Sequence, residues 1–189
     1  MSRYPVTLRQ ADHSDAPRLR ELWSDVLRKA EIGEQILDLE ATITRAQESE
    51  DERLLLAEVD GQIAGAVLLK AATISPLNTE PVIQIVSPHV FPDLRRRGVG
   101  HALLEAAATF AEEKGIHLVG IASLSGSREA NRFLARLGLA PQAVFRMAGT
   151  HQLRAKLSRS GVRQGRQLGQ VIAARRSLRR AQSMATSDS

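Results

Sequence analysis

A short turn signal most constrains what this chain can fold into. Asp60-Gly61 separates two segments rich in aliphatic residues, Arg53–Val59 and Gln62–Lys70. A two-residue Asp-Gly connection favours a tight hairpin, because both turn residues tolerate positive φ. The chain is therefore predicted to contain an antiparallel strand pair around which the other elements pack.

Hydrophobic periodicity predicts those other elements. Apolar residues recur at helical spacing from a cap near Asp12 or Ser14 to about Lys29, and Trp23 in this helix is predicted to be a core residue. The full predicted order is strand Val6–Arg9, helix to Lys29, helix Glu34–Gln47, strands Arg53–Val59, Gln62–Lys70 and Val82–Val90, helix Gly100–Lys114, strand His117–Ser123, helix Ser127–Leu137 and strand Gln142–Ala148. This order describes a mixed α/β domain.

Composition removes several classes of protein. Hydrophobic residues make up 43% and charged residues 25% of the 189 residues, as in globular proteins. The N-terminus lacks a signal-peptide pattern and no apolar stretch approaches the roughly 18–20 residues of a transmembrane helix, so we expect a cytoplasmic protein. The chain has no cysteine, which excludes disulfides and a cysteinyl intermediate, and its five scattered histidines predict no metal site.

Charge divides the chain into two parts. Residues 1–150 contain 17 basic and 20 acidic residues, a net charge of −3, whereas residues 151–189 contain nine basic residues and one acid, a net charge of +8. The basic pI of about 10.4 therefore belongs to the C-terminal part. We expect a folded domain over residues 1–157 and a basic, flexible tail over 158–189 that contacts polyanions weakly; a solvated tail without a partner remains the alternative.

The segment from Val90 to Leu104 has the features of a phosphate cradle. Gly98 and Gly100 leave backbone amides accessible where a helix begins, and a helix N-terminus attracts anions. The preceding run Arg95–Arg97 adds positive charge. The alternative is a solvated strand-to-helix turn. The spacing fits neither the dinucleotide-binding nor the nucleoside-triphosphate glycine motif, which disfavours those ligands.

This segment resembles the signature of a known enzyme superfamily. Arg95-Arg-Arg-Gly98-Val-Gly100 is similar to the Arg/Gln-x-x-Gly-x-Gly/Ala motif of the GNAT acyl-CoA-dependent N-acyltransferases, which is preceded by Val-x-Pro, here Val90-Phe91-Pro92. Ser127–Pro141 looks like the helix and turn after the family's fifth strand. The resemblance covers about residues 5–150. It implies a mainly antiparallel, twisted sheet flanked by helices, with splayed central strands.

The resemblance also implies a function and a set of site residues. The activity would be transfer of an acetyl group from acetyl-CoA directly to an amine, a small molecule or a protein, with a homodimer among the expected assemblies. Amides from Arg96 to His101 would hold the CoA pyrophosphate. The strand end at His89–Phe91 would contact the thioester and pantetheine arm. The implied cofactor-binding residues are Val90, Phe91, Arg95, Arg96, Arg97, Gly98, Val99, Gly100, His101, Ser127 and Asn131.

The catalytic positions depart from the family pattern. Gln84 stands where many members have a glutamate base, and Leu134 stands where many have a tyrosine acid. His89, Ser87 and Glu80 are candidate substitutes, and we select His89 because histidine ordinarily titrates nearest neutral pH. The competing interpretation of His89 is a packed or hydrogen-bonded strand residue. A catalytically weak acyl-CoA sensor or regulatory module is therefore the alternative function.

Overall fold

The computed structural model describes residues 5–122, 128–142 and 146–157. The chain divides into two units, Met1–Ala140 and Pro141–Ser189, which we describe separately. In the second unit the described residues include a helix over 150–157. The first unit contains strands β1 (Val6–Gln10), β2 (Glu52–Val59), β3 (Gln62–Thr73), β4 (Pro81–Val90) and β5 (Val119–Ile121), and helices α1 (Ala16–Leu22), α2 (Ile32–Glu48), α3 (Val99–Glu113) and α4 (Arg128–Arg136).

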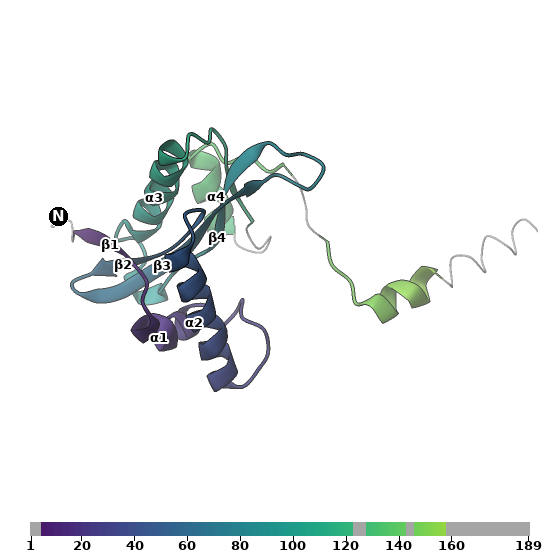
Figure 1. The fold of residues 1–189 in the computed structure, drawn as a ribbon, viewed down its shortest axis with the longest axis horizontal. Coiled ribbons are helices and arrows are strands. Elements are labelled where there is room, and N and C mark those ends of the chain that lie inside the picture. Colours follow the sequence, from purple (N-terminus) through teal and green to yellow (C-terminus); the bar gives the residue numbers. More distant parts are fainter. Residues whose placement is uncertain (1–4, 123–127, 143–145, 158–189) are drawn as a thin grey trace, which may run out of the picture. The chain divides into compact units, whose positions relative to one another are not determined.

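The five strands form one sheet in the order β1-β2-β3-β4-β5 (Figure 1). The first four run antiparallel to their neighbours, and β5 runs parallel to β4. The predicted hairpin is confirmed: β2 and β3 close through Asp60 and Gly61, whose φ angles are 54° and 73°. The fold is the mixed, mainly antiparallel sheet flanked by helices that the resemblance implied.

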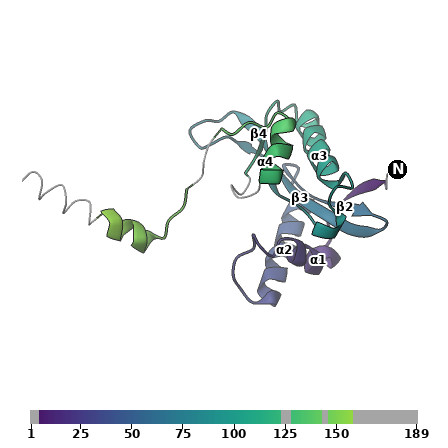
Figure 2. The ribbon, with the colours of Figure 1, turned by 180° about the vertical axis from the view of Figure 1, so that it is seen from behind.

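Helices cover both faces of this sheet (Figures 1 and 2). On one face, α3 buries Leu103 and Phe110 against the strands, and on the other α1 and α2 bury Leu19 and Ile43. Trp23 belongs to the second core with 5% of its surface exposed, which confirms the prediction for this residue. The sheet is therefore shielded on both sides, and its accessible features lie at its edges and strand ends.

Three boundaries differ from the sequence-based expectation. The first helix ends at Leu22 instead of Lys29. Trp23 caps this end with an N–H bond to the Leu19 carbonyl, and its indole bonds to the Ser87 carbonyl of the sheet. The fifth strand is shorter than the predicted range His117–Ser123. Ser123 itself lies outside the described residues. Of the predicted strand Gln142–Ala148, residues 143–145 lie outside the described residues and the others are not in a strand.

The registers of β4 with its two neighbours cover different lengths. Among the described residues, Ile83, Gln84 and Ile85 of β4 have partners in β5. On the other side, β4 stays paired with β3 as far as Val90. The splay that the resemblance implies stays a prediction, because residues 123–127 lie outside the described residues.

A buried carboxylate joins the N-terminal strand to the first helix. Asp15, 5% exposed, accepts two hydrogen bonds of 2.7 Å from the Arg9 guanidinium, which also bonds Glu58 at 2.6 Å. The Arg9 bonds hold the pKa of Asp15 below its ordinary value of 3.8, against the burial that would raise it. The ionised form of Asp15 therefore stabilises the fold.

Asp15→Asn should lower the free energy of unfolding by about 1–3 kcal/mol at pH 7, because it leaves Arg9 without its principal partner. A group whose pKa is lowered by folding stabilises at pH values above its unfolded pKa and loses that contribution as pH falls through the folded value. The difference from wild type should therefore shrink towards pH 2–3. Urea denaturation across pH measures it, with Asp38→Asn, an exposed ion-pair partner of Arg28, as the control. Equal losses in both variants at pH 7 would contradict this account.

Candidate functional site

The end of β4 contains a bulge. Leu68 of β3 lies opposite Val86, and Ala66 lies opposite His89, so β4 has one residue more than β3 between these pairs. Ser87, in that interval, has a φ of 47°, and the next residue is a proline with no N–H to donate to a ladder. The bulge therefore redirects the strand beyond Val86.

The redirected strand directs polar backbone away from β3. The Phe91 amide donates to the Ala64 carbonyl at 2.9 Å, so the backbone groups of Val90 point away from β3. The N–H of Val90 is thus not used in the pairing of β4 with β3.

The loop after β4 has a tightly turned backbone at the position where the cradle is predicted. A 3-10 turn, η2 (Pro92–Leu94), leads into the loop, in which Arg96 has a φ of 63° and Gly98 a φ of 89°. Two left-handed residues this close wrap the backbone into a concave turn, and glycine accepts that conformation without a side-chain penalty. Gly98 is the residue at which α3 is capped, so the turn leads directly into the helix.

The first amides of α3 are accessible to a ligand. The amide of Ala102 donates to the Gly98 carbonyl at 3.0 Å as the first bond of the helix, so the preceding amides at residues 99–101 have no acceptor within it. Among the described residues no side chain caps this terminus. Arg95, Arg96, Arg97 and His101 are exposed around it. Val99 is buried, whereas Gly100 is half-buried and His101 is exposed.

The two signature glycines serve different purposes. Gly98 adopts the left-handed backbone conformation that the turn requires. A Cβ added to Gly100 would lie 3.8 Å from the Phe133 ring of α4, an ordinary contact, so this position has room for a methyl group and not for a larger side chain. Asn131 lies on α4 two residues before Phe133 and is exposed, whereas Ser127 lies outside the described residues.

A third glycine, Gly65 of β3, was missed by the sequence reasoning. A Cβ there would lie 2.5 Å from the His89 carbonyl oxygen and 3.0 Å from Val99 Cγ1. Because Gly65 has no side chain, β3, the end of β4 and the start of α3 can approach one another. The available signal was a glycine inside a strand, which often marks a close backbone approach.

His89 is held by hydrogen bonds on both sides of its ring. Its Nδ1 lies 3.1 Å from the Ser87 carbonyl oxygen, which also accepts a 2.8 Å bond from the Trp23 indole. Its Nε2 lies 3.1 Å from Asp25, in the connection between α1 and α2. The His89 side chain is 25% exposed and Asp25 59%. The catalytic role of His89 stays a prediction; the sequence reasoning missed Asp25, which belongs to no periodic segment.

Glu80, Gln84 and Leu134 are the other positions considered for catalysis. Glu80 precedes the start of β4, about 30 Å from His89 along an extended strand, which removes it from this site. Gln84 is half-buried opposite Lys70 of β3. Leu134 is 8% exposed, so it packs in the core as an apolar residue.

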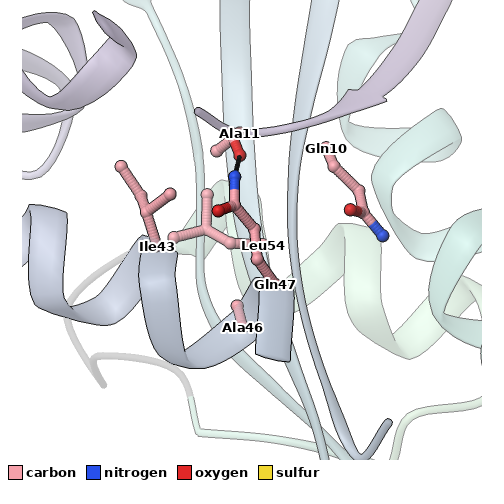
Figure 3. Close-up of a pocket in the computed structure, with 6 residues that line it drawn as sticks. All are labelled: Gln10, Ala11, Ile43, Ala46, Gln47 and Leu54. Atoms are coloured by element: carbon pink, nitrogen blue, oxygen red, sulfur yellow. Dashed lines mark hydrogen bonds between the residues drawn. The ribbon is translucent and has the colours of Figure 1, made fainter. Parts of the chain in front are cut away.

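Two cavities lie away from the cradle, where β1 ends and β2 begins. The first has no room for a water-sized molecule, and Gln47 crosses it to bond the Ala11 carbonyl at 2.9 Å; Gln10, Ala11, Ile43, Ala46, Gln47 and Leu54 line it (Figure 3). The second, of about 350 Å³, includes Arg53 and Glu113, which pair at 2.6 Å. Neither includes a residue of the candidate site.

Among the residues that the structure describes, no three histidine, aspartate or glutamate side chains gather in a way that could hold a metal ion. None of the helices described is long and apolar enough to span a membrane.

Comparison with known proteins identifies the family. The profile of the acetyltransferase (GNAT) family matches residues 16–139. The chain belongs to this family. An uncharacterized N-acetyltransferase of Methanocaldococcus jannaschii is 29% identical over 97 residues, which are 51% of this chain and 43% of that protein. The match thus spans less than half of this relative.

Solved structures support the same fold. A transcriptional regulator from Bacillus halodurans matches with a TM-score of 0.65 and 20% identity, covering 77% of this chain and 100% of the other. The aminoglycoside N-acetyltransferase AAC(6')-Iy in complex with CoA matches with a TM-score of 0.63 and 16% identity, covering 77% and 95%. Glucosamine-6-phosphate N-acetyltransferase from Arabidopsis thaliana matches with a TM-score of 0.61 and 16% identity, covering 77% of this chain and 99% of the other. The two transferases are named for different acceptors, so the family fold does not select one.

Gly65→Ala should separate β3 from the end of β4, because the new methyl group meets backbone that cannot rotate away. We expect a loss of about 1–3 kcal/mol in unfolding free energy, measured by urea denaturation. The control is Gly33→Ala in α2, where nothing lies within 4 Å of an added Cβ and helix propensity predicts a neutral or slightly stabilising effect. Wild-type stability in Gly65→Ala would show that the close approach is not a constraint.

Proposed function

We propose that this GNAT-family chain is an N-acetyltransferase that moves an acetyl group from acetyl-CoA directly to an amine. The observation that carries the proposal is the set of amides at residues 99–101, which have no acceptor within the helix, together with the Val90 backbone groups, which point away from β3. This combination suits an elongated ligand with phosphates at one end and a polar acyl group at the other.

The protein would hold CoA chiefly through the negative charge of the CoA phosphates. Amides from Arg96 to His101 would bind the pyrophosphate, and the arginines at 95–97 would strengthen the positive field. The pantetheine arm would follow the β4 edge at Val90 and Phe91. Asn131 is proposed to contact that arm; the family's more usual position, Ser127, lies outside the described residues.

The reaction requires a polarised thioester and a neutral amine. The Val90 N–H points away from β3 and would donate to the thioester oxygen as negative charge develops there. The amine nitrogen would attack the carbonyl carbon, the carbon–sulfur bond would break, and the thiolate would take a proton. His89 is the proposed proton acceptor for the amine. Positioning would supply much of the rate, because Gln84 cannot act as a base and Leu134 cannot donate a proton.

The second candidate is a catalytically weak sensor of acyl-CoA. The same Gln84 and Leu134 favour it, since both replace groups that would transfer protons. In either case we propose a cytoplasmic protein with an acyltransferase domain over residues 1–157 and a basic tail over 158–189 that makes weak contacts with polyanions. A homodimer is part of the proposal and rests on the resemblance alone.

Gly98→Ala should weaken CoA binding at least about tenfold, because alanine at a φ of 89° strains the turn by about 1–2 kcal/mol and displaces the amides. Isothermal titration calorimetry with CoA measures the affinity. Arg97→Ala is the comparison: it removes one charge and leaves the backbone in place, so its loss should be smaller. Equal losses would count against a backbone cradle, and no heat with any CoA thioester for the wild type would end the cofactor claim.

A thiol-release assay separates the enzyme from the sensor. Acetyl-CoA is incubated with small amines, amino-acid N-termini and lysine-containing peptides, and free CoA is measured with a thiol reagent. We expect at least one acceptor to raise thiol release well above hydrolysis, and His89→Gln to lower that rate about 10²–10⁴-fold with CoA affinity retained. Release at the hydrolysis rate with every acceptor would favour the sensor.

A further inference from the structure

The connection between α1 and α2 meets the β4 bulge through two side chains. Trp23, at the end of α1, donates its indole N–H to the Ser87 carbonyl at 2.8 Å. Asp25 lies 3.1 Å from Nε2 of His89. Trp23 is buried, whereas Asp25 is exposed and the His89 side chain is partly exposed. The contact at Trp23 is therefore shielded, and the contact between Asp25 and His89 can exchange protons with solvent.

His89 has a hydrogen-bond acceptor at each ring nitrogen. Its Nδ1 lies 3.1 Å from the Ser87 carbonyl oxygen, and its Nε2 faces the Asp25 carboxylate. The imidazolium form carries two N–H groups and donates to both oxygens, and its charge pairs with the carboxylate. A neutral ring carries one N–H, so in either tautomer one nitrogen lone pair faces an oxygen lone pair. That repulsion breaks one of the two contacts.

The backbone of His89 is held by the sheet. The residue lies opposite Ala66 of β3, and its carbonyl oxygen is 2.5 Å from the point that a Cβ of Gly65 would occupy. Two residues later, the Phe91 amide bonds to β3 again. The imidazole ring is thus attached to a fixed strand, so the loss of one of its contacts displaces the connection and not β4.

Other charges near this contact are engaged elsewhere. Arg28, on the same connection, pairs with Glu34 and Asp38 at 3.1 and 2.6 Å. Arg18 pairs within its own helix, α1. The β3 residue opposite the histidine is an alanine, and the arginines at 95–97 in the loop after β4 are exposed. Within the described chain, the aspartate named above is therefore the charged group in contact with the imidazole ring.

We propose that His89 is a pH-sensitive latch, which fastens the α1–α2 connection to β4 as an imidazolium and releases it as a neutral imidazole. Histidine changes its charge near neutral pH, where carboxylates are already ionised. The latch is therefore fastened below neutral pH, and its stabilisation is lost as pH rises. It does not depend on the proposed acetyl transfer. If that function holds, the fastened state is the inactive one, because an imidazolium has no lone pair to accept a proton.

Trp23 reports on the latch, because it is the only tryptophan of the chain and shares the Ser87 carbonyl with His89. An adjacent imidazolium quenches indole fluorescence more strongly than neutral imidazole does. The emission of the full chain should therefore rise in a one-proton step between about pH 5 and 8. His89→Gln should remove this step. His101→Gln, which removes an exposed histidine beside Glu105, should retain it.

Asp25→Asn should move the midpoint of this step to lower pH by about 0.2–0.7 unit, the range expected when an exposed ion pair no longer favours the charged ring. Asp38→Asn removes an equal charge from an ion pair of the same connection and should leave the midpoint unchanged. A step that persists in His89→Gln, or a wild-type midpoint in Asp25→Asn, would overturn the proposal.

A spin label measures the release of the connection. The chain has no cysteine, so Lys29→Cys, at an exposed position of the connection, carries a single nitroxide. Its electron paramagnetic resonance spectrum should show a more mobile label at pH 8 than at pH 5.5, and Asp25→Asn should give the more mobile spectrum already at pH 5.5. Glu48→Cys, exposed at the end of α2, is the control label and should not respond to pH. Equal mobility of the label at position 29 at both pH values would refute the latch.

Discussion

The bulge at the end of β4 governs the candidate site, because it changes the direction of the strand's backbone groups. The positive φ of Ser87 and the missing N–H of Pro88 interrupt the pairing with β3 beyond Val86. β3 holds β4 again through the Phe91 amide, so the Val90 backbone groups point away from β3. A backbone anchored on one side in this way is a rigid base for binding.

Local signals explain why much of this could be predicted from the sequence. Asp60-Gly61 forms a tight turn whatever surrounds it, and the spacing of Leu103, Ala107 and Phe110 needs only one buried face to give α3. The cradle is equally local, since a left-handed glycine before a helix leaves amides accessible within a few residues. These features depend on neighbours in the chain, so a single sequence contains them.

The rest depends on contacts between distant segments. Trp23 leaves its helix to reach Ser87, 64 residues away, and periodicity cannot indicate that. The same distance separates Asp25 from His89. The role of Gly65 depends on the His89 carbonyl, which only the folded sheet brings close to it. Such contacts depend on residues far apart in the sequence, which explains why the loop after β4 was easier to predict than the surroundings of His89.

Hydrogen–deuterium exchange with and without acetyl-CoA tests the central claim most directly, because the claim concerns particular backbone amides. The account predicts slower exchange in peptides covering residues 95–104 and the end of β4, with no change in α2. Binding that leaves the amides at residues 99–101 exchanging at their free rate would contradict it.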